Sequence, residues 1–246
     1  MSFEYHPVDV YRRKYAVLAK FYNNGEARLF ADVVDRDHVD APIDAYLIMI
    51  NPGSCKIQEN ESSLIKNSNY YKELDVVEAV SDPAQKCVMA FMDICNLKKI
   101  RILNLMDYKS GNYVKALSSI SQQNIEMSLF SQKREEQRKE IMSEKAVVIA
   151  AWGTDKRLSA FKEQAFHCLR GDIIIGIRPE PQKEYFDFKY IKPLTKDAQI
   201  KQIWELTRCF LQYKSETCVQ NNVHADGLWV RFLSEYYCCQ YIYYWS

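Results

Sequence analysis

Three short stretches of this sequence place a polar or aromatic side chain at the end of an apolar run. They are Asn51 after Tyr46–Ile50, Asn104 within Ile100–Leu105, and Trp152 after Ala146–Ala151. Asparagine carries a donor and an acceptor, so it can hold a water molecule or the edge of a base. Such residues at the ends of buried strands indicate a binding or hydrolytic site. The alternative is that they only terminate strands, because the same residue types dominate turns.

The most informative of these stretches is the turn Asn51-Pro52-Gly53-Ser54. Proline fixes the chain direction after the strand, and glycine allows a sharp turn with close approach of a ligand to the backbone. We expect Pro52, Gly53 and Ser54 to line a pocket together with Asn51. The other strand ends add Asn104, Trp152, Gly153 and Arg178 to this expected pocket.

Four apolar runs predict the sheet that positions these residues. They are Tyr46–Ile50, Ile100–Leu105, Ala146–Ala151 and Asp172–Ile177, each too short for a helix and separated from the next by a helical pattern. Strands that alternate with helices predict an α/β fold, here a three-layer sandwich with a central, mostly parallel four-stranded sheet. Ligands bind at the carboxyl ends of such strands, where we expect the pocket.

Further elements are expected around this core. Tyr15–Tyr22 and Ala27–Val34 predict an N-terminal β-hairpin, Gln123 to Lys145 is helix-prone, Phe186–Ile191 is a candidate last strand, and Asp197 to Lys214 predicts an amphipathic helix. We therefore expect one domain over 1–214, with its core at 44–194 and C-terminal helices. Residues 56–81 are expected to form a long loop or lid. The aromatic extension 215–246 predicts a partner surface or a homo-oligomer contact.

The charge balance limits the partners. The chain of 246 residues has 48% hydrophobic and 26% charged residues and a formal net charge of +1, so no strong non-specific attraction to nucleic acid is expected. Nucleic acid or a nucleotide is still the expected partner, bound through a local basic rim. We expect Lys56, Lys109, Lys156 and Arg157 to form that rim, with solvated surface charges as the alternative.

Several classes of protein are not expected. No apolar stretch is long enough for a membrane span, and Met1 to Val10 has no apolar signal segment, so the expected location is cytoplasmic. The eight cysteines show no zinc-ligand spacing, so no metal or other cofactor is expected. Phosphate-loop, dinucleotide-binding and nucleophile-elbow motifs do not occur in the sequence.

The strand ends resemble a known family. Asn51-Pro52-Gly53-Ser54, Asp82-Pro83 opening a helix that carries Cys87, Ile102-Leu103-Asn104-Leu105 and Val148 to Gly153 are similar, in order and spacing, to the bacterial and phage family called domain of unknown function 1643. The resemblance covers roughly Tyr46 to Leu194. It implies no measured activity.

A more distant resemblance is to the uracil-DNA glycosylase superfamily. Ile50-Asn51-Pro52-Gly53 is similar to the first motif of its mismatch-specific branch. The resemblance implies that Asn51 is the catalytic residue that positions the attacking water, that Asn104 reads the base, and that Tyr70, Tyr71 or Tyr108 stacks on a flipped base. Arg178-Pro179-Glu180-Pro181 departs from the superfamily's second motif, because no histidine is present there.

Three hypotheses about function follow. The first is an enzyme that recognises a nucleobase and hydrolyses an N-glycosidic bond. The second is a non-catalytic module that binds nucleotides or modified DNA in the same pocket, which the missing histidine favours. The third is an interaction protein that acts through the aromatic residues of Gly227 to Ser246.

Overall fold

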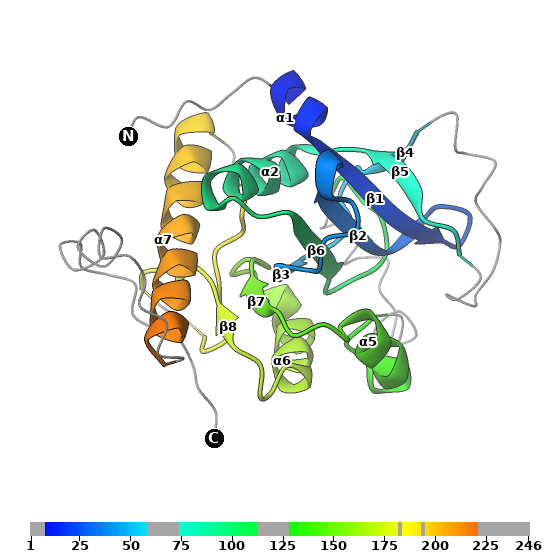
Figure 1. Cartoon of the computed structure of the whole chain (residues 1–246). Coiled ribbons are helices and arrows are strands. Elements are labelled where there is room, and N and C mark those ends of the chain that lie inside the picture. Colours follow the sequence, from blue (N-terminus) through cyan, green and yellow to red (C-terminus); the bar gives the residue numbers. More distant parts are fainter. Residues whose placement is uncertain (1–7, 59–73, 113–127, 182–183, 193–194, 221–246) are drawn as a thin grey trace.

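A computed structural model describes residues 8–58, 74–112, 128–181, 184–192 and 195–220. Within these residues, eight strands form a mixed sheet in the order β4-β5-β1-β2-β6-β3-β7-β8, with helices on both faces (Figure 1). The α/β class predicted from the sequence is therefore confirmed. The predicted extent of four strands is wrong, because the N-terminal hairpin and the described ends of the 56–81 segment join the same sheet.

One half of the sheet is parallel and contains the four strands that precede the candidate pocket. In sheet order these are β6 (Lys99–Asn104), β3 (Ala45–Met49), β7 (Val147–Ala150) and β8 (Ile174–Ile175). Alternate residues of β3 face opposite sides of the sheet: Leu47 and Met49 belong to one hydrophobic core, and Tyr46 and Ile48 to the other. Both faces are covered, which explains the continuous apolar runs in the sequence.

The other half of the sheet is antiparallel. It consists of β2 (Ala27–Asp35), β1 (Tyr15–Tyr22), β5 (Val77–Val80) and β4 (Lys56–Ile57). The predicted hairpin of β1 and β2 is confirmed, and its turn uses positive φ angles of 52° and 53° at Asn23 and Asn24. A register shift between Lys20 and Phe21 places Arg28 opposite Phe21. The expected loop at 56–81 instead contributes β4 and β5 at its described ends.

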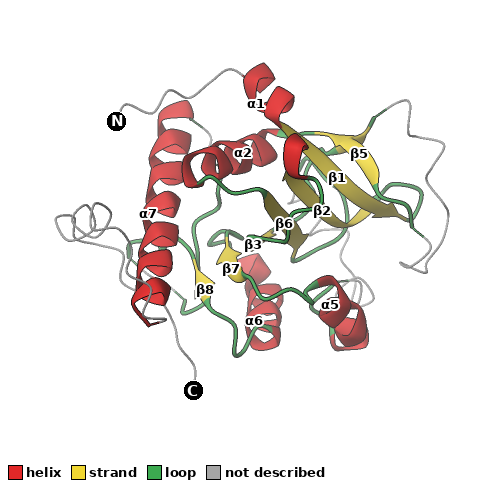
Figure 2. Cartoon of the chain, in the orientation of Figure 1, coloured by secondary structure: helices red, strands yellow, loops and turns green. Residues whose placement is uncertain are grey.

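The helices form two layers (Figure 2). On one face, α1 (Val8–Lys14), α2 (Pro83–Cys95) and α7 (Lys196–Gln220) pack over one core, and on the other face α5 (Glu135–Ile141) and α6 (Ser159–Cys168) pack over the second. Short 3-10 helices span Arg36–His38, Gln132–Arg134 and Lys156–Leu158. No helix in the described ranges is both long and apolar enough to cross a membrane.

Three other predictions need correction. The helix expected from Gln123 to Lys145 is limited, in its described part, to Gln132–Arg134 and α5. The candidate strand at Phe186–Ile191 makes a single bridge, from Phe188 to Gly153. The last helix continues past 214 to Gln220. Tyr70, Tyr71 and the aromatic residues of 221–246, with the homo-oligomer contact predicted there, lie outside the described residues.

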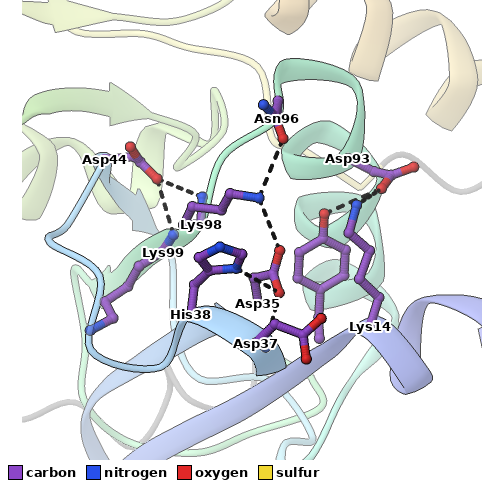
Figure 3. Close-up of polar contacts among 10 residues, drawn as sticks. Lys14, Asp35, Asp37, His38, Asp44, Asp93, Asn96, Lys98 and Lys99 are labelled. Carbon is purple, nitrogen blue, oxygen red and sulfur yellow. Dashed lines mark hydrogen bonds and ion pairs between the residues drawn. The ribbon is translucent and has the colours of Figure 1, made fainter.

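The amino-terminal end of the parallel strands is held by a polar network (Figure 3). The backbone N–H groups of Lys98 and Lys99 donate to Asp44 Oδ2 at 2.6 and 3.1 Å, which joins the start of β6 to the loop before β3. Lys98 Nζ donates to Asp35 Oδ2 at 3.2 Å, and His38 Nδ1 lies 3.3 Å from Asp35 Oδ1. Hydrogen bonds and ion pairs of Asp35 and Asp44 therefore stabilise this end of the sheet. The opposite end carries the candidate site.

Candidate functional site

The ends of β3 and β6 bring two predicted site residues together. Met49 is paired with Asn104 in the parallel register. Beyond the strands, Leu105 N donates to Met49 O at 2.9 Å and Met106 N to Ile50 O at 3.0 Å. Because the two segments stay paired past the last residues of β3 and β6, Asn51 and Asn104 lie close together at this edge of the sheet.

Asn104 is fully buried and joins its neighbours. In the amide orientation that satisfies both of its polar atoms, Nδ2 donates to the backbone oxygen of Asn51 at 3.1 Å, and Oδ1 accepts from Nη2 of Arg28 at 3.3 Å. We call Arg28, Asn51 and Asn104 the strand-end cluster. Since both amide atoms of Asn104 are used, this residue holds the other two in position.

Asn51 keeps one polar atom available. Its Nδ2 donates to the backbone oxygen of Ser110 at 2.7 Å, and its side chain is almost fully buried. Within the described part of the chain, Oδ1 of Asn51 accepts no hydrogen bond. The bond to Ser110 fixes the amide, so the carbonyl oxygen is a pre-oriented acceptor for a water molecule or a ligand N–H group.

Arg28, at the start of β2, is the third member of the cluster. Only 2% of the residue is exposed, and neither Nε nor Nη1 has a hydrogen-bond partner among the residues that the structure describes. Among the described carboxylates, none forms an ion pair with Arg28. Buried polar groups are normally hydrogen-bonded, so an enclosed guanidinium with two unused nitrogens indicates a site that a ligand or ordered water completes.

The turn after β3 packs against the start of α2. Gly53 has φ +63°, and a Cβ atom there would lie 2.6 Å from Oδ2 of Asp82. Asp82 caps α2: its Oδ1 accepts from the N–H groups of Ala84 and Gln85, both at 2.9 Å, and its own N–H group donates to Gln85 Oε1 at 2.7 Å. The capping carboxylate is thereby held over the turn that carries Asn51.

Tyr190 closes the same region from the segment that follows β8. Its Cβ lies 3.8 Å from the position of a Cβ on Gly153, and Ile50 Cδ1 lies 3.6 Å from that position. Burial raises the pKa of the Tyr190 phenol well above its ordinary value, and the nearby negative charge of Asp82 raises it further, whereas Arg28 lowers it. These charges act on Tyr190, so it lies within electrostatic reach of Asp82 and Arg28.

Trp152 and Arg178 have mainly structural contacts. The indole N–H of Trp152, which is fully buried, donates to Phe186 O at 2.8 Å. Arg178 donates to the backbone oxygens of Tyr185 and Asp187, and its guanidinium carbon lies 4.0 Å from the ring centre of Phe188. Both side chains therefore fix the 184–188 segment, which supports Gly153 and Tyr190.

The predicted basic rim is divided. Lys109 is half-buried, its Nζ donates to Gly25 O at 2.8 Å, and burial lowers its pKa, as do the positive charges of Arg28 and Lys56. Lys56 is exposed on β4. Lys156 and Arg157 lie after β7, both exposed, and Arg157 pairs with Asp155 at 2.6 Å. Lys56 and Arg28 thus both lie within electrostatic reach of Lys109, whereas Lys156 and Arg157 belong to another strand end.

The remaining predicted residues lie close to the turn or on another face. Pro52 is buried, and Ser54 is exposed with its Cβ near Gly111. Tyr108 is 44% exposed and pairs with Ala27. Because Arg28 N donates to Asp107 O and Lys109 N to Glu26 O on either side of that pair, Tyr108 faces away from Arg28 and Lys109.

Sequence reasoning missed Arg28 and Tyr190 and recognised Asp82 only as a helix cap. One available signal was the charge of Arg28 within the otherwise apolar Ala27 to Ala31. In the described ranges, no group of three His, Cys, Asp or Glu side chains could hold a metal ion. No protein-family model, curated protein or solved structure matches this chain.

Proposed function

We propose that the strand-end cluster binds a nucleobase or nucleotide and that the chain hydrolyses the N-glycosidic bond of this ligand. The observation that carries the proposal is the fixed amide of Asn51. Its Nδ2 is held by Ser110 O, and its Oδ1 has no partner among the described residues. The resemblance of Ile50-Asn51-Pro52-Gly53 to a glycosylase motif points to the same atom.

The reaction requires the protein mainly to position the attacking water and the leaving base. The base leaves C1′ of the sugar with the electron pair of the glycosidic bond, water adds to C1′, and the proton of that water ends on the base. The sugar develops positive charge during this step, so an oriented water and a polar surrounding lower the barrier most. Asn51 Oδ1 accepts a hydrogen bond from the water and directs its lone pair.

The neighbouring groups have supporting roles in this proposal. Asn104 fixes the Asn51 backbone and the Arg28 guanidinium. Lys56 and Lys109 form the part of the basic rim that attracts a nucleotide or a nucleic-acid strand to the cluster. Arg178 supports the site indirectly, through the segment that carries Tyr190.

Base release tests the proposal. The protein is incubated with single- and double-stranded oligonucleotides containing uracil, mismatched thymine or modified pyrimidines, and with free nucleosides and nucleotides, and free base is measured by chromatography. We expect Asn51→Ala to slow release by about 10²-fold, the usual loss for a positioning or charge-stabilising group. Asn96→Gly is the control, because Asn96 caps the far end of α2 with φ 52° and glycine accepts that conformation. Equal rates for Asn51→Ala and wild type would exclude the assignment.

A second candidate function is binding without turnover. It is favoured by the position of the missing histidine, where Arg178 is bonded to the backbone oxygens of Tyr185 and Asp187 and no acid–base group replaces it. Saturable binding of a nucleotide or modified oligonucleotide, with no product after long incubation, is the result expected for a sensing module.

A further inference from the structure

Arg28 is a buried cation with two guanidinium nitrogens, Nε and Nη1, that no described protein group accepts a hydrogen bond from. The buried carboxylate of Asp107, opposite Arg28 in the ladder, lies within electrostatic reach of Arg28, but no hydrogen bond joins the two side chains. Asp107 Oδ2 instead accepts from Arg134 at 2.5 Å and from the Tyr22 hydroxyl at 2.9 Å. Arg28 itself forms no ion pair with a described carboxylate and leaves Nε and Nη1 without partners. Buried donors that make no hydrogen bond are costly, so the Nε and Nη1 groups of Arg28 call for an acceptor, and an anionic oxygen is the strongest acceptor for a guanidinium.

A second cation lies on the same face as Arg28. Across the hairpin, Arg28 is paired with Phe21, and the ammonium of Lys109 lies 5.2 Å from the centre of the Phe21 ring. The hydrogen bonds Arg28 N to Asp107 O (2.9 Å) and Lys109 N to Glu26 O (2.8 Å) flank the Ala27–Tyr108 pair. Arg28 and Lys109 are therefore diagonal neighbours on one face of this short ladder.

The three cationic side chains become more buried toward the strand-end cluster. Lys56 is exposed, Lys109 is half-buried and Arg28 is enclosed. Glu26, opposite Lys109, is exposed, and water screens its charge more than it screens the enclosed guanidinium. The cationic groups therefore become more enclosed, and less screened by water, toward the strand-end cluster.

We propose that Lys56, Lys109 and Arg28 form a phosphate-binding path into the strand-end cluster, so that its ligand is a nucleotide rather than a free base or nucleoside. This inference rests on the proposed function of the cluster. Lys109 and Arg28 donate charge-assisted hydrogen bonds to phosphate oxygens, and Lys56 attracts the anion at the surface. The base then lies toward Asn51. The phosphate belongs either to a free mononucleotide or to the backbone of a strand.

Titration calorimetry distinguishes these cases. The intact chain is titrated with the 5′-monophosphates of uridine, thymidine, cytidine, adenosine and guanosine, with the five nucleosides, and with a single-stranded 12-mer of mixed sequence. We expect at least one monophosphate to bind ten times or more tightly than its nucleoside. Lys109→Met should reduce that ratio by about tenfold, as expected for the loss of one hydrogen bond to a charged group. Arg28→Met should remove the preference. Lys139→Met, in exposed α5, is the control and should keep it.

Each outcome decides the question. Equal affinity for nucleosides and monophosphates would overturn the phosphate path and leave base recognition intact. Absence of binding by every ligand would overturn the proposed function itself. Tighter binding of the 12-mer than of any monophosphate assigns the phosphate to a strand. If Arg28→Met does not fold, Lys109→Met and the salt dependence of monophosphate binding still test the proposal, because binding through the path must weaken as salt rises.

Discussion

At the scale of single residues, neighbouring asparagines differ in what they can still bind. Asn104 uses both amide atoms on Asn51 and Arg28, whereas Asn51, in the described part of the chain, uses only Nδ2, on Ser110. An asparagine after an apolar strand is thus not by itself a ligand-binding residue. The difference arises from Arg28, which reaches Asn104 from a strand distant in sequence.

The turn that carries Asn51 depends on glycine at 53. Gly53→Ala places a Cβ at φ +63° and 2.6 Å from Asp82 Oδ2, and Asp82 cannot move without weakening the cap of α2. We expect a loss of about 2–4 kcal/mol in the free energy of unfolding, combining backbone strain with part of the capping energy. Gly153→Ala is the control, because its φ is +80° but its nearest contact is an ordinary 3.6 Å. Urea denaturation giving equal losses for both variants would contradict the clash with Asp82.

The buried pair Lys162–Asp187 makes a separate prediction. Lys162 is fully buried, and its Nζ lies 2.5 Å from Asp187 Oδ1. Lys162→Met leaves a buried carboxylate without its partner, so we expect the free energy of unfolding to fall by about 3–5 kcal/mol. Adding Asp187→Leu to Lys162→Met should restore much of it. Lys139→Met, which breaks exposed pairs, should change stability little. A Lys162→Met protein as stable as wild type would show that the pair is not structurally required.

At the scale of elements, the segment after β8 supports the site without regular secondary structure. Trp152 donates to Phe186 O from β7's end, Arg178 donates to the oxygens of Tyr185 and Asp187, and Lys189 N donates to Ile177 O at 2.7 Å. These bonds replace the strand pairing that the sequence predicts for this segment.

Trp152→Phe removes the bond to Phe186 O while keeping an aromatic ring against Phe188. The half-buried carbonyl of Phe186 then loses its donor, so we expect faster amide hydrogen exchange in the 184–192 segment, with exchange in β1 and β2 unchanged. Trp204→Phe, in α7, is the matched control. Unaltered exchange at 184–192 would mean that other bonds are sufficient to hold this segment.

The sequence predicts elements best where their apolar pattern is long. β1, β2 and the start of α2 at Asp82-Pro83 agree with the prediction, because each has a distinct turn or cap signal. β4 and β5 have two and four residues within a polar stretch, so the pairing of β5 with β1 and of β4 with β5 could not be predicted from the local sequence. The 186–191 segment has a strand-like composition, but side-chain donors bond to several of its carbonyl oxygens, those of Phe186, Asp187 and Tyr190.

The candidate site was predictable only in part, because some of its contacts join segments that are distant in sequence. Parallel topology implies that Asn51 and Asn104 are close together, and the structure pairs Asn104 with Met49 and bonds its amide to the backbone oxygen of Asn51. The sequence could not indicate that Arg28 joins them, because this depends on β2 pairing with β6 and on the register shift near Lys20. Nor could it separate Trp152 and Arg178, whose backbone contacts depend on the path of a loop.

At the scale of the whole molecule, the two ends of the sheet differ in how their buried charged groups are paired. Near the carboxyl ends of β3 and β6, Arg28 remains without an ion pair among the described residues. Near the amino ends, Asp35 is surrounded by His38, Lys98 and the N–H group of Asp37. We expect the first end to govern ligand binding and the second to govern acid stability.

The pH dependence of unfolding follows from Asp35. Burial raises its pKa, but the hydrogen bonds from His38, Asp37 N–H and Lys98, with the charge of Lys98, outweigh burial and hold the pKa below its ordinary value. A carboxyl with a lowered folded-state pKa stabilises the protein fully above its unfolded-state pKa, about 4, and loses this contribution as pH falls through the folded-state pKa. Asp35→Asn should therefore lower the free energy of unfolding at pH 7, and its difference from wild type should shrink below about pH 4. Asp37→Asn, at an exposed position of the same loop, should follow the wild-type curve. Urea denaturation from pH 2.5 to 8 measures both curves, and a constant offset between Asp35→Asn and wild type across this range would remove Asp35 from the acid transition.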